Sequence, residues 1–157
     1  MGGIEMDPEA IGRAMAEGTP HALALGFVFV SAEAGTGVLK VPWREDLVGD
    51  PQSGVLAGGV VTALLDHACG LAVASLGAAG STATLDLRID YMRPAEPRRD
   101  VFARAHCYKM GHTIAFVRAV AFETDPADPI AAAQAAFVVN PPEGAQPSIR
   151  GGASAGP

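Results

Sequence analysis

Residues 58–76, GGVVTALLDHACGLAVASL, decide the fold of this chain. The stretch contains no proline, and its spacing predicts a helix with apolar residues around almost the whole circumference. A helix that is apolar all round is buried in a core rather than laid on a surface. Asp66 is its only charge and shares one face with small residues at spacings of three and four. That stripe consists of Gly59, Ala63, Asp66, Gly70, Ala74 and Gly77.

Strand patterns flank this helix on both sides. LDLRIDY at residues 85–91 alternates apolar and polar residues, which is the period of a strand. Residues 130–140 are ambiguous, because their alanines favour a helix while Phe-Val-Val at 137–139 favours a strand. The order of strand, strand, long helix and then three or four strands in hairpin series predicts an α+β fold with an antiparallel sheet around one buried helix. The remaining expected elements are a short helix at 7–17, strands at 24–31, 38–43, 101–109 and 113–123, a hairpin at 110–112 and a loop at 44–53.

The composition is that of a single globular domain. The chain has 157 residues, of which 49% are hydrophobic and 18% charged, so a disordered chain is excluded. We expect one domain over residues 1–140 and a disordered tail over 141–157, which is rich in Gly, Ser, Ala and Pro. The strand at 113–123 is apolar on both faces, which suggests that another copy of the chain covers its outer face.

Several classes of protein are excluded by what the sequence lacks. The two cysteines are far apart without CxxC spacing, and no HxxxH or HExxH occurs, so we expect no metal site. The N-terminus has no apolar core typical of a signal peptide, and Asp66 and His67 interrupt the apolar stretch 54–80, which argues against a membrane span. A net charge of −6 argues against non-specific nucleic-acid binding. The sequence therefore predicts a cytoplasmic protein with no membrane or nucleic-acid partner.

The positive charge is concentrated in one segment. Seven of the eleven cationic residues lie between Arg88 and Arg118 against three anionic ones, so that segment carries +4 and the rest of the chain −10. Such a zone on an acidic protein suggests a small polyanionic ligand, although solvated arginines on strand faces would give the same pattern.

Asp66 and the glycine pair at the start of the helix are the candidates for chemistry. A lone carboxylate in an apolar helix is unfavourable unless it is paired or functional, and a hydrogen bond to a neighbouring strand or a partner subunit is the structural alternative. Gly58 and Gly59 would let a ligand approach the free N–H groups of the helix N-terminus, or would merely allow close helix–sheet packing. His67 points about 100° away from Asp66 around the helix, so the two do not form a ready dyad.

Two motifs together resemble a known family. GVLAGGVVTALLD at 54–66 and TATLDLRIDYMRP at 82–94 are similar to the hotdog-fold acyl-CoA thioesterases of the phenylacetic-acid-degradation type. Their pattern is G-x-L-H-G-G-x-x-x-x-L-x-D, followed by a strand ending in Y-x-R-P. The resemblance covers about residues 24–140.

The resemblance implies hydrolysis of acyl-CoA to a free acid and CoA, without any cofactor. Asp66 matches the general base or nucleophile, and Gly58, with Gly59 beside it, matches the amide that polarises the thioester carbonyl. Thr84 matches a residue contributed across a dimer interface. The resemblance also implies subunits joined edge to edge as a homodimer, which often pairs into a dimer of dimers.

The chain departs from the family pattern at two places. Ala57 stands where the family has histidine. Related enzymes often carry Asn or Gln near position 51, where this chain has proline, so Asp50 or Gln52 would have to serve instead. Gln52 is preferred, because its amide can donate to a carbonyl and a carboxylate cannot. The Ala57 departure leaves a non-catalytic acyl-CoA binder as an alternative, with a hotdog hydratase or dehydratase as a more distant one. For the CoA phosphates and pantetheine the resemblance points to the segment after the helix, with Arg93 and Lys109 first, and then Arg98, Arg99, Gly111 and His112.

Overall fold

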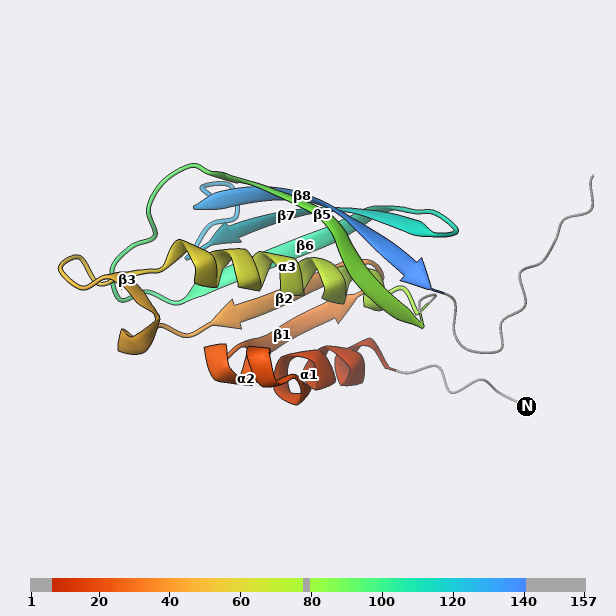
Figure 1. Ribbon diagram of the computed structural model, residues 1–157, viewed down its shortest axis with the longest axis horizontal. Helices are drawn as coiled ribbons and strands as arrows, with labels where there is room; N and C mark the ends of the chain where they lie inside the picture. Colours follow the sequence, from red (N-terminus) through yellow and green to blue (C-terminus); the bar gives the residue numbers. More distant parts are fainter. Residues whose placement is uncertain (1–6, 78–79, 141–157) are drawn as a thin grey trace, which may run out of the picture.

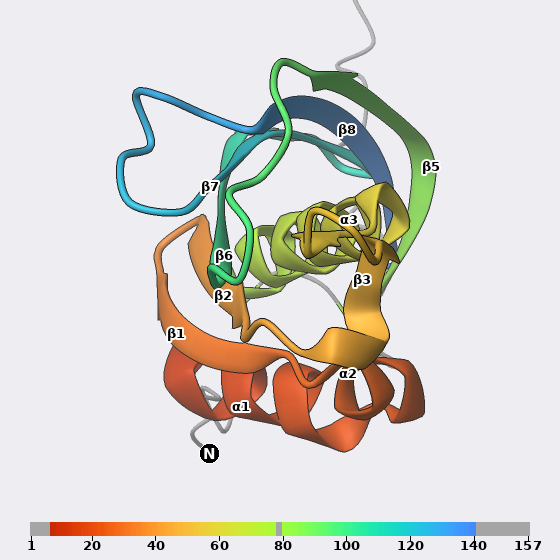
Figure 2. The same cartoon turned by 90° about the vertical axis from the view of Figure 1, so that its left-hand side faces the viewer.

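One antiparallel sheet curls around a central helix in this protein (Figures 1 and 2), as seen in a computed structural model that describes residues 7–77 and 80–140. The helix is α3, Gly58–Ala74, two residues shorter than expected. The sheet has the strand order β1-β2-β6-β7-β8-β5. The predicted α+β architecture is therefore confirmed. The six strands are β1 (Val28–Glu33), β2 (Thr36–Val41), β5 (Ser81–Tyr91), β6 (Val101–Met110), β7 (Ile114–Phe122) and β8 (Ala131–Asn140).

The core lies between α3 and the concave face of the sheet. Leu64, Leu65 and Leu71 of α3 are fully buried. The sheet meets them largely with alanines, whose small side chains let the strands pass close to the helix. The stripe of small residues on α3 includes its least buried positions: Gly59 is exposed and Asp66 is partly exposed. This face of α3 is therefore the one from which a ligand can approach. The inward alanines are Ala103, Ala105, Ala115, Ala119, Ala121, Ala131, Ala133 and Ala135.

The strands after α3 do not form a simple hairpin series, so that part of the prediction was wrong. β5 pairs with β8 rather than with β6, and the loop between β5 and β6 carries the chain across one end of the sheet. Strand β6 pairs with β2 and β7, and the β6–β7 hairpin forms where expected. As a result β5 is an edge strand, and it runs beside α3 (Figure 2).

The ambiguous segment 130–140 is strand β8. It pairs with β5 on one side and β7 on the other. Its alternate alanines at 131, 133 and 135 are buried under α3. Pairing on both sides overrides the helix propensity of alanine, because propensity is weak beside tertiary contacts.

The N-terminal segment contains two helices, of which the second was not predicted. Helix α1 (Pro8–Gly18) is capped by the Asp7 side chain, which accepts the Glu9 N–H at 3.2 Å. Helix α2 (Pro20–Leu25) takes the first two residues of the strand expected at 24–31. Proline suits the first helical position, and Gly26 ends α2 in the left-handed region at φ 71°. Because of these two local signals, β1 begins only at Val28.

The segment expected to be a loop at 44–53 has structure that leads into α3. A 3₁₀ helix η1 (Glu45–Leu47) precedes β3 (Val48–Asp50), which pairs with β4 (Val55–Leu56). Strand β4 ends two residues before α3 begins. This small hairpin therefore fixes the start of the helix.

Two expectations are not decided by the fold. The tail expected at 141–157 lies outside the described residues. On the outer face of β7, Ile114 and Phe116 are 36% and 39% exposed, and a second copy covering them stays a prediction.

No helix in the described ranges is long and apolar enough to span a membrane.

Candidate active site

Asp66 lies two turns into α3 and faces β5. Its Oδ1 accepts a hydrogen bond of 2.8 Å from Thr84 Oγ1, the only side-chain partner of this carboxylate within residues 7–77 and 80–140. The expectation of a buried carboxylate was wrong, because Asp66 is only partly buried. The resemblance placed the threonine across a dimer interface, whereas here β5 of the same chain brings Thr84 to Asp66. The arrangement leaves Oδ2 free to contact water or a substrate.

The N-terminus of α3 has unused backbone donors. Its N-cap, Ala57, provides no side-chain hydrogen bond, and its carbonyl accepts the Val60 N–H at 3.0 Å. The N–H groups of Gly58 and Gly59 have no acceptor in the described part of the chain. Free N–H groups at a helix N-terminus, together with the helix dipole, favour a negatively charged or carbonyl oxygen.

The packing around Gly58 and Gly59 does not require glycine. A Cβ on Gly59 would meet no atom within 4 Å, and one on Gly58 would meet only the Tyr91 ring, from 3.8 Å, which is ordinary contact. The alternative that this pair serves close helix–sheet packing is therefore wrong. What the glycines leave is open space in front of two free donors.

A row of polar groups between α3 and β5, called the polar row below, runs from the glycine pair to Asp66. Gly58, Thr62 and Asp66 follow one another at a spacing of four on a single face of α3. Strand β5 faces them with Tyr91 beside Gly58 and Thr62, and with Thr84 beside Asp66. Thr62 and Tyr91 were not among the predicted site residues. Both could have been found, since Thr62 has the helical spacing and Tyr91 belongs to the Y-x-R-P motif.

Other residues expected near the chemistry are not brought to Asp66. His67 faces α1, where its Nε2 lies 3.0 Å from the Met15 carbonyl oxygen and its ring packs against Phe27. Gln52 is exposed on the turn between β3 and β4, where its N–H donates to Asp50 Oδ1 at 3.0 Å. No cluster of three or more metal-binding side chains occurs among the described residues.

Arg93 has a structural role, which corrects the expectation that it binds phosphate. Its guanidinium makes hydrogen bonds of 3.1 and 2.7 Å to the two carboxylate oxygens of Glu123, whose side chain is only 3% exposed. The remaining donors bind the Pro94 carbonyl at 3.2 Å, Asp128 Oδ1 at 3.4 Å and the Asp128 carbonyl at 2.8 Å. All five N–H donors are thus in use, and these partners raise the pKa of Arg93 above its ordinary value.

Arg98, in contrast, has a free guanidinium beside a cavity. Its backbone is left-handed, with φ 56°, and its N–H donates to the Gly54 carbonyl at 3.3 Å. The guanidinium carbon lies 5.9 Å from the centre of the Trp43 ring. Within the described ranges this guanidinium makes no hydrogen bond or ion pair. The cavity measures about 220 Å³ and is lined by Trp43, Glu45, Val48, Pro51, Gly54 and Arg98.

Three further candidates for CoA binding lie at the opposite end of the sheet. Lys109, Gly111 and His112 are at the β6–β7 hairpin, which is at the other end of the sheet from the loop that carries Arg93 and Arg98 (Figure 1). Gly111 has a structural reason to be glycine, because a Cβ there would lie 2.8 Å from the Ile114 carbonyl oxygen. One chain therefore does not gather the expected phosphate-binding residues into a single site.

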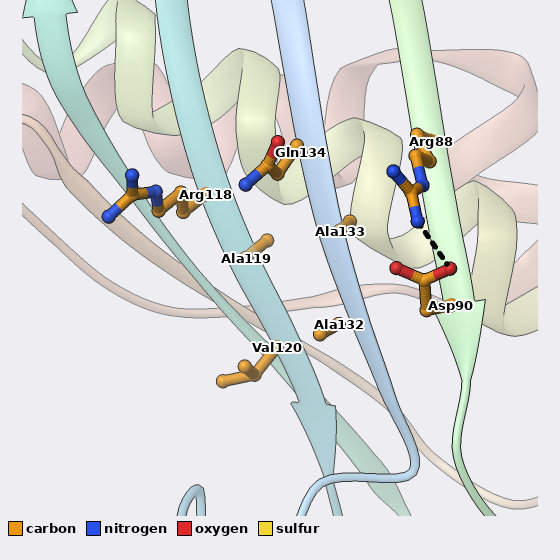
Figure 3. Close-up of a pocket in the computed structure, with 8 residues that line it drawn as sticks. All are labelled: Arg88, Asp90, Arg118, Ala119, Val120, Ala132, Ala133 and Gln134. Carbon is orange, nitrogen blue, oxygen red and sulfur yellow. Dashed lines mark hydrogen bonds and ion pairs between the residues drawn. The ribbon is translucent and has the colours of Figure 1, made fainter.

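A larger hollow lies on the outer face of the sheet, away from α3. It measures about 370 Å³, and Figure 3 shows Arg88, Gln134 and Arg118 projecting from β5, β8 and β7. Arg88 donates to Asp90 at 3.2 Å. Neither Asp66 nor the glycine pair lines this hollow. It is therefore separate from the candidate active site.

Comparisons with known proteins agree with this architecture. The model of the family described as "Thioesterase superfamily" matches residues 53–130, which include both Gly58 and Asp66. A curated Halobacterium salinarum protein, provisionally named an esterase, is 37% identical over 94 residues, a region that spans 57% of this chain and 61% of that protein.

Solved structures extend the likeness to more than three quarters of the chain. A Pseudomonas aeruginosa protein of 36% identity superposes with a TM-score of 0.77, covering 84% of this chain and 98% of its own. A variant of the phenylacetic acid degradation protein from Thermus thermophilus, 26% identical, superposes with a TM-score of 0.68 and covers 78% of this chain and 100% of its own. The sheet curled around α3 is the hotdog fold, and the chain belongs to the thioesterase superfamily.

Proposed function

We propose that this protein hydrolyses acyl-CoA thioesters to a carboxylic acid and CoA at the N-terminal end of α3. Membership of the thioesterase superfamily supports a thioester substrate. The observation that carries the proposal is the pair of free amides at Gly58 and Gly59, which open onto empty space with Asp66 two turns further along the same helix face.

The reaction divides between these groups. The free amides donate to the thioester carbonyl oxygen and take up the negative charge that develops there. Asp66 either removes a proton from the attacking water or attacks the carbonyl carbon itself, and Thr84 holds its carboxylate in place. In either case a C–O bond forms, the C–S bond breaks, and the CoA thiolate leaves and takes up a proton. If Asp66 is the nucleophile, water then hydrolyses the anhydride between Asp66 and the acyl group and releases the acid. The proposal requires water and no cofactor.

The alternative is an acyl-CoA binder that does not hydrolyse its ligand, motivated by Ala57. Hydrolysis is favoured because Asp66 does not depend on residue 57: its hydrogen-bond partner is Thr84 on β5. A hydratase is disfavoured because His67 is turned toward α1. We propose an aryl-acetyl, benzoyl or medium-chain acyl group.

We propose further that the active unit is a homodimer joined along β5. Support comes from β5 being an unpaired edge with apolar side chains nearby, since Leu85 and Met92 are 57% and 59% exposed. Because Thr84 and Tyr91 of β5 contact Asp66 and Gly58, a second copy on this edge would lie close to the proposed site. The exposed outer face of β7 is the candidate for pairing two dimers.

Replacing Gly59 by alanine should raise stability while lowering activity. The added methyl meets no atom within 4 Å, and alanine is preferred over glycine in a helix by roughly 0.5–1 kcal/mol. The methyl would, however, occupy the open space in which the thioester approaches the amide. Thermal unfolding and kcat/KM measured on the same sample test this. Gly18→Ala is the control, because a Cβ there also meets nothing. Unchanged kcat/KM in Gly59→Ala would contradict the proposal.

Arg98 is the proposed contact for a CoA phosphate, in place of Arg93. Replacing Arg98 by alanine should raise KM for an acyl-CoA by about tenfold, which corresponds to about 1.4 kcal/mol. It should leave KM unchanged for the same acyl group on N-acetylcysteamine, which has no phosphate. Arg104→Ala on the outer face of β6 is the matched control. Equal effects on both substrates would rule out a phosphate contact.

A further inference from the structure

We infer that Tyr91 is a positioning residue for hydrolysis. It acts through the peptide group between Gly58 and Gly59, whose N–H donates to the thioester carbonyl oxygen. This inference rests on the proposed function, because it concerns the oxygen-binding amide of that same site. Tyr91 is the last residue of β5 and lies beside the first turn of α3.

The Tyr91 hydroxyl is bonded directly to this peptide group. Tyr91 Oη donates to the Gly58 carbonyl oxygen at 2.6 Å. That carbonyl and the Gly59 N–H belong to one planar unit. A hydrogen bond that fixes the oxygen of Gly58 therefore also fixes the direction of the Gly59 N–H.

Thr62 completes the contact. Its Oγ1 lies 2.6 Å from Tyr91 Oη and 3.2 Å from the Gly58 oxygen. Each hydroxyl has one proton, so three arrangements are possible: Thr62 donates to Tyr91, which donates to Gly58; Tyr91 donates to Thr62, which donates to Gly58; or both donate to Gly58. In every arrangement at least one O–H points at the Gly58 carbonyl. Linked hydrogen bonds of this kind polarise one another.

The start of α3 needs such support. Its N-cap is Ala57, without a side-chain hydrogen bond, and two successive glycines follow. Glycine in a helix loses more conformational entropy than any other residue, so this first turn would fray without an anchor. The Tyr91 and Thr62 hydroxyls anchor it from the carbonyl side, which leaves the N–H side open to the ligand.

The Tyr91 hydroxyl also polarises the peptide group that it orients. Donation to a peptide oxygen shifts electron density toward that oxygen and makes the N–H of the same group a stronger donor. A stronger donor matters most when the thioester oxygen becomes an oxyanion, so its loss should reduce kcat more than substrate binding.

Replacing Tyr91 by phenylalanine should lower kcat about tenfold and leave KM within about twofold. Deleting an oxyanion donor outright costs about 10²–10³ in kcat, and Tyr91 acts through the donor rather than as the donor. Thr62→Val should lower kcat by less than Tyr91→Phe does. Thr62→Ser, which keeps the hydroxyl, should have the kcat of the wild type. Tyr108→Phe is the matched control, because Tyr108 lies on β6 against Phe116 and Arg118.

A second readout follows the amide itself. In protein labelled with ¹⁵N-glycine, Tyr91→Phe should move the Gly59 ¹H–¹⁵N resonance upfield, whereas Tyr108→Phe should leave it unchanged. A purely structural role for Tyr91 would lower the melting temperature and raise KM without the specific kcat loss.

The possible results separate the two claims. Wild-type hydrolysis with a kcat loss and a Gly59 shift in Tyr91→Phe supports the inference. Wild-type hydrolysis with unchanged kcat in Tyr91→Phe overturns the inference and leaves the proposed function standing. A wild-type protein that hydrolyses no acyl-CoA overturns the proposed function, and with it the role of Tyr91 in hydrolysis.

Discussion

Replacement of Asp66 by asparagine is expected to lower kcat for thioester hydrolysis by about 10³-fold, within the range typical of a general base. Asparagine has the same shape, and its Oδ1 can still accept the Thr84 hydroxyl, so the fold should be retained. The amide can neither accept a proton from water nor attack the thioester. Thiol release followed with a thiol reagent measures the loss, and circular dichroism checks the fold.

A neighbouring carboxylate provides the control for this variant. Asp86 lies on β5 in register with Ala136, on the outer side of the sheet, and Asp86→Asn should keep wild-type kcat. Thr84→Ala should give a milder loss than Asp66→Asn, because Thr84 only orients the carboxylate. Wild-type turnover by Asp66→Asn would end the assignment of Asp66 as base or nucleophile.

Replacement of Arg93 by methionine is expected to lower the free energy of unfolding by about 3 kcal/mol, the scale for breaking one side of a buried ion pair. Among the residues that the structure describes, the substitution leaves the Glu123 carboxylate with the Glu96 N–H at 2.7 Å as its one donor and with no cation in contact. For a chain of this length the melting temperature should fall by roughly 6–12 °C. Adding Glu123→Gln should recover part of the loss, because it removes the unpaired buried charge.

The exposed pair Arg88–Asp90 is the control for Arg93. Its side chains are 73% and 60% exposed, so Arg88→Ala should cost less than about 1 kcal/mol. Arg93→Met should leave the KM ratio between acyl-CoA and the N-acetylcysteamine thioester unchanged in the fraction that is folded. A melting temperature equal to that of the wild type would contradict the structural role.

The same contact makes stability depend on pH. Burial raises the pKa of Glu123, but the hydrogen bonds from Arg93 and the Glu96 N–H outweigh it and leave the pKa below its ordinary value. The ionised form is thus favoured in the folded state, so this stabilisation is present above the ordinary pKa and is lost as pH falls through the folded value. In acid melts the stability advantage of the wild type over Glu123→Gln should shrink as the pH is lowered.

The sequence predicted those elements whose pattern is imposed by burial. Helix α3 and strand β5 were recognisable because their periods reflect the core that they enclose. Helix α2 was missed because Ala-Leu-Gly-Phe-Val-Phe-Val at 24–30 reads as a strand, although the Pro20 and Gly26 signals decide the local structure. Strand β8 stayed ambiguous because its alanines, taken in isolation, favour a helix. Their other role, which is to let the sheet pack closely against α3, becomes visible only in the fold.

The candidate residues on one helix could be proposed from the sequence, but the contacts that other elements make with the candidate residues could not. Asp66, Gly58 and Gly59 follow from the pattern of one helix, and the structure brings Thr84 to Asp66. The partners of an arginine cannot be read from its own position. Arg93 meets Glu123 and Asp128 only because the loop after β5 folds over the loop between β7 and β8.

The polar row between α3 and β5 depends on the strand order of the sheet. Because β5 pairs with β8, its inward residues Thr84 and Tyr91 come to lie beside α3 rather than at the far end of a hairpin series. No local signal in the sequence fixes that order. It follows from long-range pairing, which single-segment patterns do not encode.

The measurement that tests the central claim most directly is release of free thiol by the wild-type protein from phenylacetyl-, 4-hydroxybenzoyl-, short-, medium- and long-chain acyl-CoA. We expect turnover of at least one of these thioesters, with acid and CoA formed in equal amounts. Tight binding of an acyl-CoA with no thiol released over hours would contradict the account and identify the protein as an acyl-CoA binder.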